Sequence, residues 1–206
     1  MNEKGIDPAS IWQCMAREKI YQYKDRKTNY IELFKDKVKT PSGKTMYYTW
    51  YRSSDVVVIV PYLDDDTLVM INQYRYPLGK KLLEFPAGHV ETGEDPAITA
   101  SRELREETGY KANEIKCIYK YHPSVSKSKQ VVYVFKATEL IKGKARLDRT
   151  EDIHVLSLKV KELRNMIETK KIENAGTLIP FLLCCTEINL SRGRNRQNRI
   201  QRNRSK

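Results

Sequence analysis

Cysteine is scarce in this sequence, and its four copies form no recognisable binding pattern. No two cysteines have CxxC spacing and no Cys/His cluster occurs, so neither a zinc site nor a disulfide framework is expected. Cys184 and Cys185 lie in the apolar run LIPFLLCC, where we expect them to pack in the core.

Long apolar stretches are absent as well. No run approaches the roughly 20 residues that a membrane-spanning helix needs, and the mean hydropathy is −0.64. The first ten residues, MNEKGIDPAS, lack the apolar core of a signal peptide. We therefore expect no membrane association and a cytoplasmic location. The 206 residues provide for one ordinary domain and a modest extra element.

Acidic residues are missing from the end of the chain. Residues 191–206 hold seven basic residues, whereas the chain as a whole has a net charge of +12. Such a segment cannot bury enough apolar surface to become ordered, so we expect a disordered basic tail. Its arginines could attract RNA or another polyanion. The alternative, a solvated terminus without a ligand, is favoured because no aromatic residue is interleaved to stack on bases.

The rest of the chain divides into a β-rich segment, residues 1–54, and an α/β segment, residues 55–190. In the first segment, a turn at residues 41–43 separates two strand candidates, which predicts an antiparallel hairpin over residues 30–39 and 45–52. In the second segment, β-branched and apolar runs predict strands over residues 55–61, 67–73, 114–121, 130–137 and 153–159. Helices are predicted over residues 96–108, 161–169 and 175–188.

The most informative stretch is GHVETGEDPAITASRELREETGY, residues 88–110. Asp95 is a good helix N-cap, Pro96 suits the first helical position, and Gly109 is a natural stop. The stretch therefore predicts a loop, a helix and a turn.

Three glutamates of this helix share one face. Glu103, Glu106 and Glu107 have the spacing i, i+3, i+4, so their like charges repel each other. RELREE alone would more often be an ordinary solvated face. Crowded carboxylates are also what a hard divalent cation such as Mg²⁺ requires. The wider spacing decides between the two interpretations.

The spacing matches the box G-x5-E-x7-R-E-U-x-E-E-x-G-U of Nudix hydrolases, where U is a bulky aliphatic residue. The matching positions are Gly88, Glu94, Arg102, Glu103, Leu104, Glu106, Glu107 and Gly109. Tyr110 is the one departure, in the last bulky position. The flanking segments QYRYP and LEFPAG resemble those of ADP-ribose pyrophosphatases in this superfamily. The resemblance implies an α/β/α sandwich with a mixed sheet, preceded by the N-terminal antiparallel sheet.

The resemblance also implies a function. It is Mg²⁺-dependent hydrolysis of the diphosphate bond in a nucleoside diphosphate sugar, with Mn²⁺ as a possible substitute. ADP-ribose is the first candidate and would give AMP and ribose 5-phosphate. Arg102 would pair with Glu94, hold the loop on the helix, and support catalysis by the three glutamates. The implied metal ligands are the carbonyl oxygen of Ala87 and the carboxylates of Glu103, Glu106 and Glu107.

Further residues would bind the substrate. Arg75 and Glu84 resemble residues that line the cleft, and the fork of donors on Arg75 suits a phosphate. In the N-terminal segment, Trp50, Tyr30 and Arg52 occupy positions where the family binds adenine, often across a homodimer interface. Ordinary packing within the hairpin is the alternative role for these aromatic residues. A homodimer is expected by resemblance alone.

One expected catalytic group has no acidic residue at its position. The family commonly places a catalytic glutamate in the loop that here reads HPSVSKSKQVVYVF, and Gln130 holds the nearest position. Glu106 could act as the base instead, or a later acid, Glu151 or Asp152, could do so. Otherwise the chain is a non-catalytic Nudix module that binds a nucleotide, or RNA through its basic tail.

Overall fold

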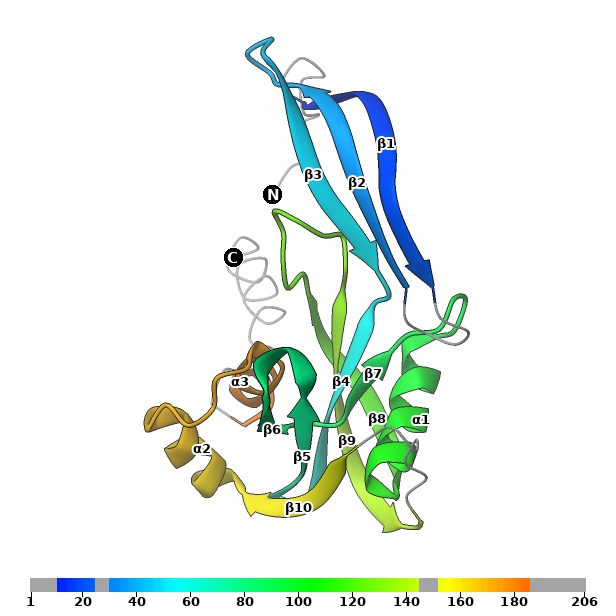
Figure 1. The fold of residues 1–206 in the computed structure, drawn as a ribbon. Helices are drawn as coiled ribbons and strands as arrows, with labels where there is room; N and C mark the ends of the chain where they lie inside the picture. The colour runs from blue at the N-terminus through cyan, green and yellow to red at the C-terminus, as the bar shows by residue number, and fades with distance from the viewer. Residues whose placement is uncertain (1–10, 25–29, 145–151, 186–206) are drawn as a thin grey trace, which may run out of the picture.

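The computed structural model describes residues 11–24, 30–144 and 152–185. Its first strands form an antiparallel sheet made of β1 (Gln13–Lys24), β2 (Tyr30–Lys39) and β3 (Thr45–Ser53), in that order. The predicted hairpin corresponds to β2 and β3. β1 was not predicted, because every residue of β1 is exposed and the alternation typical of a half-buried strand is missing. This N-terminal sheet projects from the rest of the molecule (Figure 1).

The second sheet has seven strands. They are β4 (Val56–Asp64), β5 (Thr67–Arg75), β6 (Lys80–Glu84), β7 (Ala87–His89), β8 (Tyr110–Tyr121), β9 (Val132–Lys142) and β10 (Ile153–Lys159). The main path is β10-β5-β4-β9-β8, while β6 pairs with β5 and β7 with β4. The pair β4–β9 is parallel, whereas β7 runs antiparallel to β4, so the sheet is mixed as expected.

Helices cover both faces of this sheet. They are α1 (Pro96–Thr108), α2 (Val160–Glu168) and α3 (Ala175–Cys184), and a short 3₁₀ turn spans Tyr76–Leu78. Val57 and Ile59 of the central strand β4 are buried in the cluster that includes α1. The alternating residues Val58 and Val60 are buried in the cluster that includes α2 and α3. The predicted α/β/α sandwich is therefore confirmed.

Several boundaries differ from the predicted ones. β8 begins at Tyr110, directly after α1, rather than at residue 114, and β9 continues to Lys142 rather than 137. α3 ends at Cys184 and not at residue 188, because Cys185 already has non-helical backbone angles. The predicted disordered tail, residues 191–206, lies outside the described residues.

The apolar end of the described chain packs as expected. Cys184 and Cys185 contact the buried cluster beneath α2 and α3, and burial raises the pKa of the Cys184 thiol to about 12. The phenolic hydroxyl of Tyr62 donates a hydrogen bond to the carbonyl oxygen of Cys184 at 3.0 Å. Over the ranges the structure covers, none of the helices has the length and apolarity that crossing a membrane requires.

Candidate active site

The helix with the three glutamates begins and ends at fixed points. The side chain of Asp95 accepts a hydrogen bond from the Ala97 backbone N–H at 2.7 Å, and Pro96 is the first helical residue. Gly109 ends the helix in the left-handed conformation, with φ 78°, and its N–H donates to the carbonyl oxygen of Arg105. The local sequence therefore fixes where α1 starts and stops.

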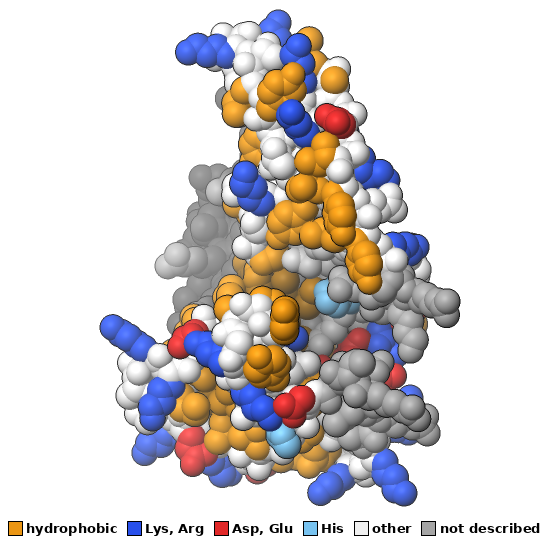
Figure 2. All heavy atoms as spheres, viewed as in Figure 1, with side chains coloured by type: hydrophobic (Ala, Val, Ile, Leu, Met, Phe, Trp, Pro, Cys, Tyr) orange, Lys and Arg blue, Asp and Glu red, His pale blue; other side chains and the backbone are white. Residues whose placement is uncertain are grey.

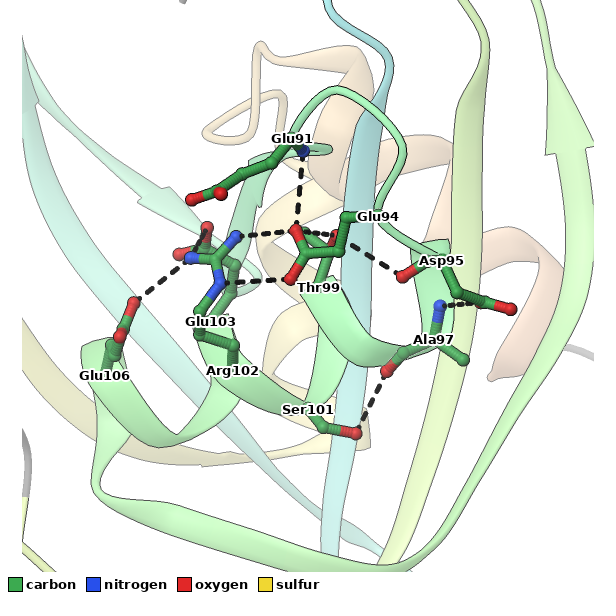
Figure 3. Close-up of polar contacts among 9 residues, drawn as sticks. All are labelled: Glu91, Glu94, Asp95, Ala97, Thr99, Ser101, Arg102, Glu103 and Glu106. Carbon is green, nitrogen blue, oxygen red and sulfur yellow. Dashed lines mark hydrogen bonds and ion pairs between the residues drawn. The ribbon is translucent and has the colours of Figure 1, made fainter. Parts of the chain in front are cut away.

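The loop before α1 is tied to the helix through Glu94. This carboxylate accepts hydrogen bonds from the Thr99 hydroxyl at 2.7 Å and from Arg102 at 3.2 Å (Figure 3). Partial burial tends to raise the pKa of Glu94, but the bonds from Arg102 and Thr99 outweigh it and hold the pKa below its ordinary value. The expected contact between Glu94 and Arg102 is present. Thr99, which is fully buried, was not predicted because a threonine on a helix gives no pattern of its own.

Arg102 joins the loop to two of the three glutamates. Its guanidinium lies 2.7 Å from Glu103 and 3.2 Å from Glu106, in addition to its bond with Glu94 (Figure 3). Partial burial opposes the charge on Arg102, yet the surrounding carboxylates raise its pKa above the ordinary value. Arg102 thus offsets the repulsion within the acidic cluster.

The third glutamate is turned towards the sheet. Glu107 is only 3% exposed and accepts a hydrogen bond from the backbone N–H of Ala87 on β7 at 2.9 Å. Next to this contact, Glu103 lies directly over Gly88, where a Cβ atom would come within 2.1 Å of its carboxylate. The glycine therefore allows the Glu103 carboxylate to lie against β7.

The acidic cluster was predicted to hold a metal ion. Within the described parts of the chain, no group of three His, Cys, Asp or Glu side chains is arranged as a ligand set. Glu103 and Glu106 face Arg102 instead, and Glu107 faces the backbone of Ala87. The donor set still fits a hard cation, because it consists of oxygen ligands on two neighbouring elements. Metal binding would require the guanidinium to share or release its carboxylates.

Two predicted substrate-binding residues contact each other. The Arg75 guanidinium donates to both carboxylate oxygens of Glu84, with the Nε–Oε1 distance at 3.0 Å. Glu84 is 9% exposed, so the pair holds a buried carboxylate at the end of β6, two residues before Pro86 and the glycine segment. In this structure Arg75 is therefore a partner of Glu84.

The three predicted residues of the N-terminal sheet have different surroundings. Trp50 stacks on Phe34 at a centroid distance of 4.6 Å and donates from its indole N–H to Asp36 at 3.0 Å. Arg52 pairs with the buried carboxylate of Glu32, whose pKa is lowered by hydrogen bonds from Arg52 and Lys19. Only Trp50 of the three predicted residues faces the cavity described next.

A cavity of about 400 Å³ lies between the N-terminal sheet and the loop of residues 122–131. Its walls include Trp12, Arg17, Tyr48, Trp50, Lys127 and Lys129. Sequence reasoning missed Trp12, Arg17 and Tyr48. Arg17 belongs to β1, the strand that the pattern did not reveal, and its partner Asp36 lies directly across from it on β2.

Gln130 is held within the same loop. Its side-chain amide donates to the backbone carbonyl oxygen of Ser54 at 2.6 Å, and its backbone N–H donates to the Ser128 hydroxyl. An amide in this position cannot accept a proton from water. Of the other acids considered, Asp152 pairs with Lys81 at 3.0 Å, and Glu151 lies outside the described residues.

Comparisons with known proteins agree with this geometry. A NUDIX domain model matches residues 52–179. The chain is 32% identical over 167 residues to an ADP-ribose pyrophosphatase of Bacillus subtilis, covering 80% of this chain and 88% of that protein. It is 32% identical over 169 residues to a methanol dehydrogenase activator of Bacillus methanolicus, covering 78% and 91%. It is also 40% identical over 90 residues to an ADP-sugar pyrophosphatase of Mus musculus, covering 37% and 40%.

A solved structure supports the fold. The crystal structure of an ADP compounds hydrolase is similar with a TM-score of 0.71 at 22% identity, covering 84% of this chain and 91% of that one. The family match spans more than half of the chain, and it contains the loop, helix and glycine contacts described above. Sequence, geometry and relatives lead to one conclusion: the chain belongs to the NUDIX family.

Proposed function

We propose that this chain hydrolyses the diphosphate bond of a nucleoside diphosphate sugar. ADP-ribose is the first candidate, with AMP and ribose 5-phosphate as products. The observation that carries the proposal is the placement of Glu103, Glu106 and Glu107 on one helix beside the backbone of β7. Relatives named ADP-ribose pyrophosphatase and ADP-sugar pyrophosphatase support the substrate class.

Mg²⁺ is the proposed cofactor, and Mn²⁺ is its proposed substitute. Such an ion neutralises phosphate oxygens and lowers the pKa of a bound water. Glu103, Glu106, Glu107 and the carbonyl oxygen of Ala87 would be its ligands. Arg102 would then reduce the repulsion between the glutamates. It would also hold the loop before α1 through its ion pair with Glu94.

Glu106 is the residue that we propose as the general base. Its side chain is 35% exposed, whereas that of Glu103 is 13% exposed, so Glu106 is the more accessible of these two glutamates. Gln130 cannot take a proton, and Asp152 directly precedes β10 and does not belong to the helix that carries the acidic cluster. A water beside Glu106 would attack one phosphorus of the diphosphate while the Glu106 carboxylate takes its proton. The bridging P–O bond would break, and the other phosphate would leave as the second nucleotide or sugar monophosphate.

The cavity at the N-terminal sheet is the proposed binding site of the nucleotide base. Trp50 provides an aromatic wall there, and aromatic rings stack on bases. Tyr30 and Arg52 do not line the cavity, and we propose that they contribute to substrate binding from beside it. Arg75 and Glu84 are proposed to line the cleft nearer the acidic helix. We also propose that the chain forms a homodimer and is cytoplasmic. The proposed domain boundaries are residue 54, where the N-terminal segment ends, and residue 190, where the Nudix domain ends.

Hydrolysis can be tested with a panel of nucleotides. ADP-ribose, NADH, GDP-mannose and diadenosine polyphosphates are incubated with the protein and Mg²⁺, and a coupled phosphatase releases inorganic phosphate from the products. Activity on at least one member is expected, with ADP-ribose first. Turnover of none would leave the alternative, a non-catalytic module that binds a nucleotide, which the glutamine at position 130 favours.

The substitution Glu107→Gln is expected to lower the rate by at least about 10²-fold, because it removes one charge that the metal needs. The fold should be retained, since the amide oxygen can still accept the Ala87 N–H bond. Glu168→Gln, the same change at an exposed position on α2, is the control and should keep full activity. A Glu107→Gln protein with most of the original rate would show that the metal site is elsewhere.

A further inference from the structure

The cavity beside the N-terminal sheet combines aromatic walls with an excess of positive charge. Trp12 meets Tyr48 edge-on with ring centroids 6.1 Å apart, and Trp50 forms another part of the wall. Arg17, Lys127 and Lys129 contribute three cations, whereas Asp36 is the one anion among the lining residues. A base could stack on the rings, but a neutral nucleoside would leave the surplus charge unmatched.

The surplus charge is carried by the two lysines. Arg17 is neutralised by Asp36, with which it forms hydrogen bonds at 2.8 and 2.9 Å. Among the residues that the structure describes, neither Lys127 nor Lys129 has an ion pair with a carboxylate. The Lys127 ammonium lies over the Tyr48 ring at 5.7 Å, and that of Lys129 lies over Trp50 at 5.3 Å.

The loop that carries these lysines is fastened to β3. The backbone N–H of Tyr51 donates to the carbonyl oxygen of Lys127 at 2.8 Å, and the Tyr48 hydroxyl donates to that of Ser126 at 2.5 Å. Gln130 adds its bond to Ser54 at the end of the loop. Figure 1 shows this loop, which joins β8 to β9, rising alongside β3. The lysines are therefore presented from a fixed backbone, which lowers the entropic cost of binding an anion.

The loop that lines the cavity and the strand that precedes the acidic helix meet at the start of β4. Asp55 connects them, because its side chain accepts from Val131 at the end of the loop and its carbonyl oxygen accepts from Val90 beyond β7. β7 and β9 flank β4 on opposite sides, so at about 4.8 Å per strand spacing they lie roughly 10 Å apart. The loop that lines the cavity and the strand that precedes the acidic helix are therefore anchored to the same part of β4.

We infer that this cavity selects nucleotides that carry a phosphate group in addition to the diphosphate that is cleaved. Lys127 and Lys129 would bind that extra phosphate while the aromatic walls hold the base. The phosphate could be a monoester on the ribose or part of a longer phosphate chain, and both have the same chemistry. The inference refines the proposed function by naming the substrate class.

The two tryptophans of the chain make binding measurable without catalysis. Trp12 and Trp50 are the only tryptophans in the sequence, and both line the cavity. Tryptophan fluorescence of the full chain is titrated in EDTA with ADP-ribose, 2′-phospho-ADP-ribose and diadenosine tetraphosphate. One or both of the more highly phosphorylated ligands should bind about 10-fold or more tightly than ADP-ribose. The tighter ligand identifies the source of the phosphate.

A double variant tests the role of the lysines. Lys127→Gln with Lys129→Gln should weaken binding of the more phosphorylated ligand by about 10-fold more than binding of ADP-ribose, and so remove the preference. Lys142→Gln with Lys144→Gln, at the same spacing and exposed at the end of β9 away from the loop, is the matched control and should keep the preference. Equal binding of all three ligands, no binding of any, or equal losses in both double variants would overturn the inference.

The two proposals fail separately. A preference for the more phosphorylated ligands that persists in EDTA, in a protein that hydrolyses nothing with Mg²⁺, would overturn the proposed hydrolysis alone. Hydrolysis of ADP-ribose by a protein without this preference would overturn the selectivity alone. Product analysis for 2′-phospho-ADP-ribose must use chromatography, because the coupled phosphatase would attack that substrate directly.

Discussion

At the scale of single residues, the site depends on how closely β7 and α1 approach each other. Gly88→Ala would place a methyl group within 2.1 Å of the Glu103 carboxylate and force that side chain to move. We expect hydrolysis to fall by about 10²-fold, since displacement of a catalytic group by about 1 Å has an effect of that size. The loss of stability should be only about 1 kcal/mol, because the obstructing atoms belong to a flexible side chain.

The control for this substitution lies on another helix. At Gly176 in α3 the nearest atom to an added Cβ is 3.6 Å away, an ordinary contact, so Gly176→Ala should keep both activity and stability. Steady-state rates with ADP-ribose and urea unfolding measure the two effects. Full activity in Gly88→Ala would mean that the position of Glu103 does not matter for the reaction.

The contacts of Gln130 explain why an amide occupies this position. By resemblance we expected a glutamate near this position, but here the side-chain amide donates a hydrogen bond to the backbone carbonyl oxygen of Ser54. A carboxylate at the same place would set an oxygen against that carbonyl oxygen. The Gln130 amide therefore suits a loop that is bound to Ser54. The general base is then expected among the glutamates of α1.

At the scale of elements, β2 carries a row of buried carboxylates, although it belongs to the sheet that projects from the molecule. Glu32 and Asp36 are 7% and 5% exposed, and they alternate with Phe34 and Val38 on one face. Hydrogen bonds from Arg17, followed by one from Trp50, lower the pKa of Asp36 below its ordinary value despite burial. The sheet is thus held together on this face by cross-strand ion pairs as well as by apolar contacts.

The lowered pKa of Asp36 predicts a dependence of stability on pH. Because the folded state binds the proton less readily than the unfolded chain, the ion pair stabilises above the unfolded value and is lost as pH falls through the lowered one. Asp36→Asn should unfold about 1 kcal/mol more easily at pH 7, allowing for screening at half-exposed Arg17.

The same variant should lose less stability than the original protein between pH 5 and about pH 3, because one titrating group is gone. Urea unfolding at each pH measures both effects. Gln22→Ala, on exposed β1, provides a comparison that leaves the buried carboxylates in place. Parallel pH profiles for Asp36→Asn and the original chain would show that this ion pair does not contribute.

At the scale of the whole molecule, the projecting sheet exposes apolar side chains that a single chain does not cover. Tyr21, Tyr23, Ile31 and Tyr47 are between 40% and 62% exposed, and β1 has no buried residue. Figure 2 shows hydrophobic side chains along this sheet, with lysines and arginines between them. Exposed apolar patches of this kind are typical of contact surfaces, which supports the proposed homodimer.

Sedimentation equilibrium can test the dimer. The original chain should have twice the 24.1 kDa of one copy, and Ile31→Lys should shift it towards the single copy because a charge would be buried in the contact. Ile141→Lys makes the same change at an exposed position on β9 and should leave the assembly intact. A single-copy mass for the unmodified protein would exclude the dimer at the concentrations used.

The bounds of α1 and the face that its glutamates share could be predicted from the sequence, because both depend on residues close together in the chain. Asp95, Pro96 and Gly109 define α1 through capping and backbone preference, and the 3.6-residue period places Glu103, Glu106 and Glu107 on one face. The same reasoning predicted β4, β5, β8, β9 and β10 of the central sheet, whereas the short strands β6 and β7 were not predicted. These features depend on neighbours only a few residues apart.

Other features were decided by the tertiary structure. β1 was missed because its pairing with β2, and not its own burial pattern, makes it a strand. The cavity joins Arg17, Trp50 and Lys129, which come from distant parts of the chain, and its charge exists only once they meet. The turn of Glu107 towards Ala87 is likewise a contact between two elements. Sequence periodicity specifies which way a side chain faces along its own element, but the partner it finds there depends on how the chain packs.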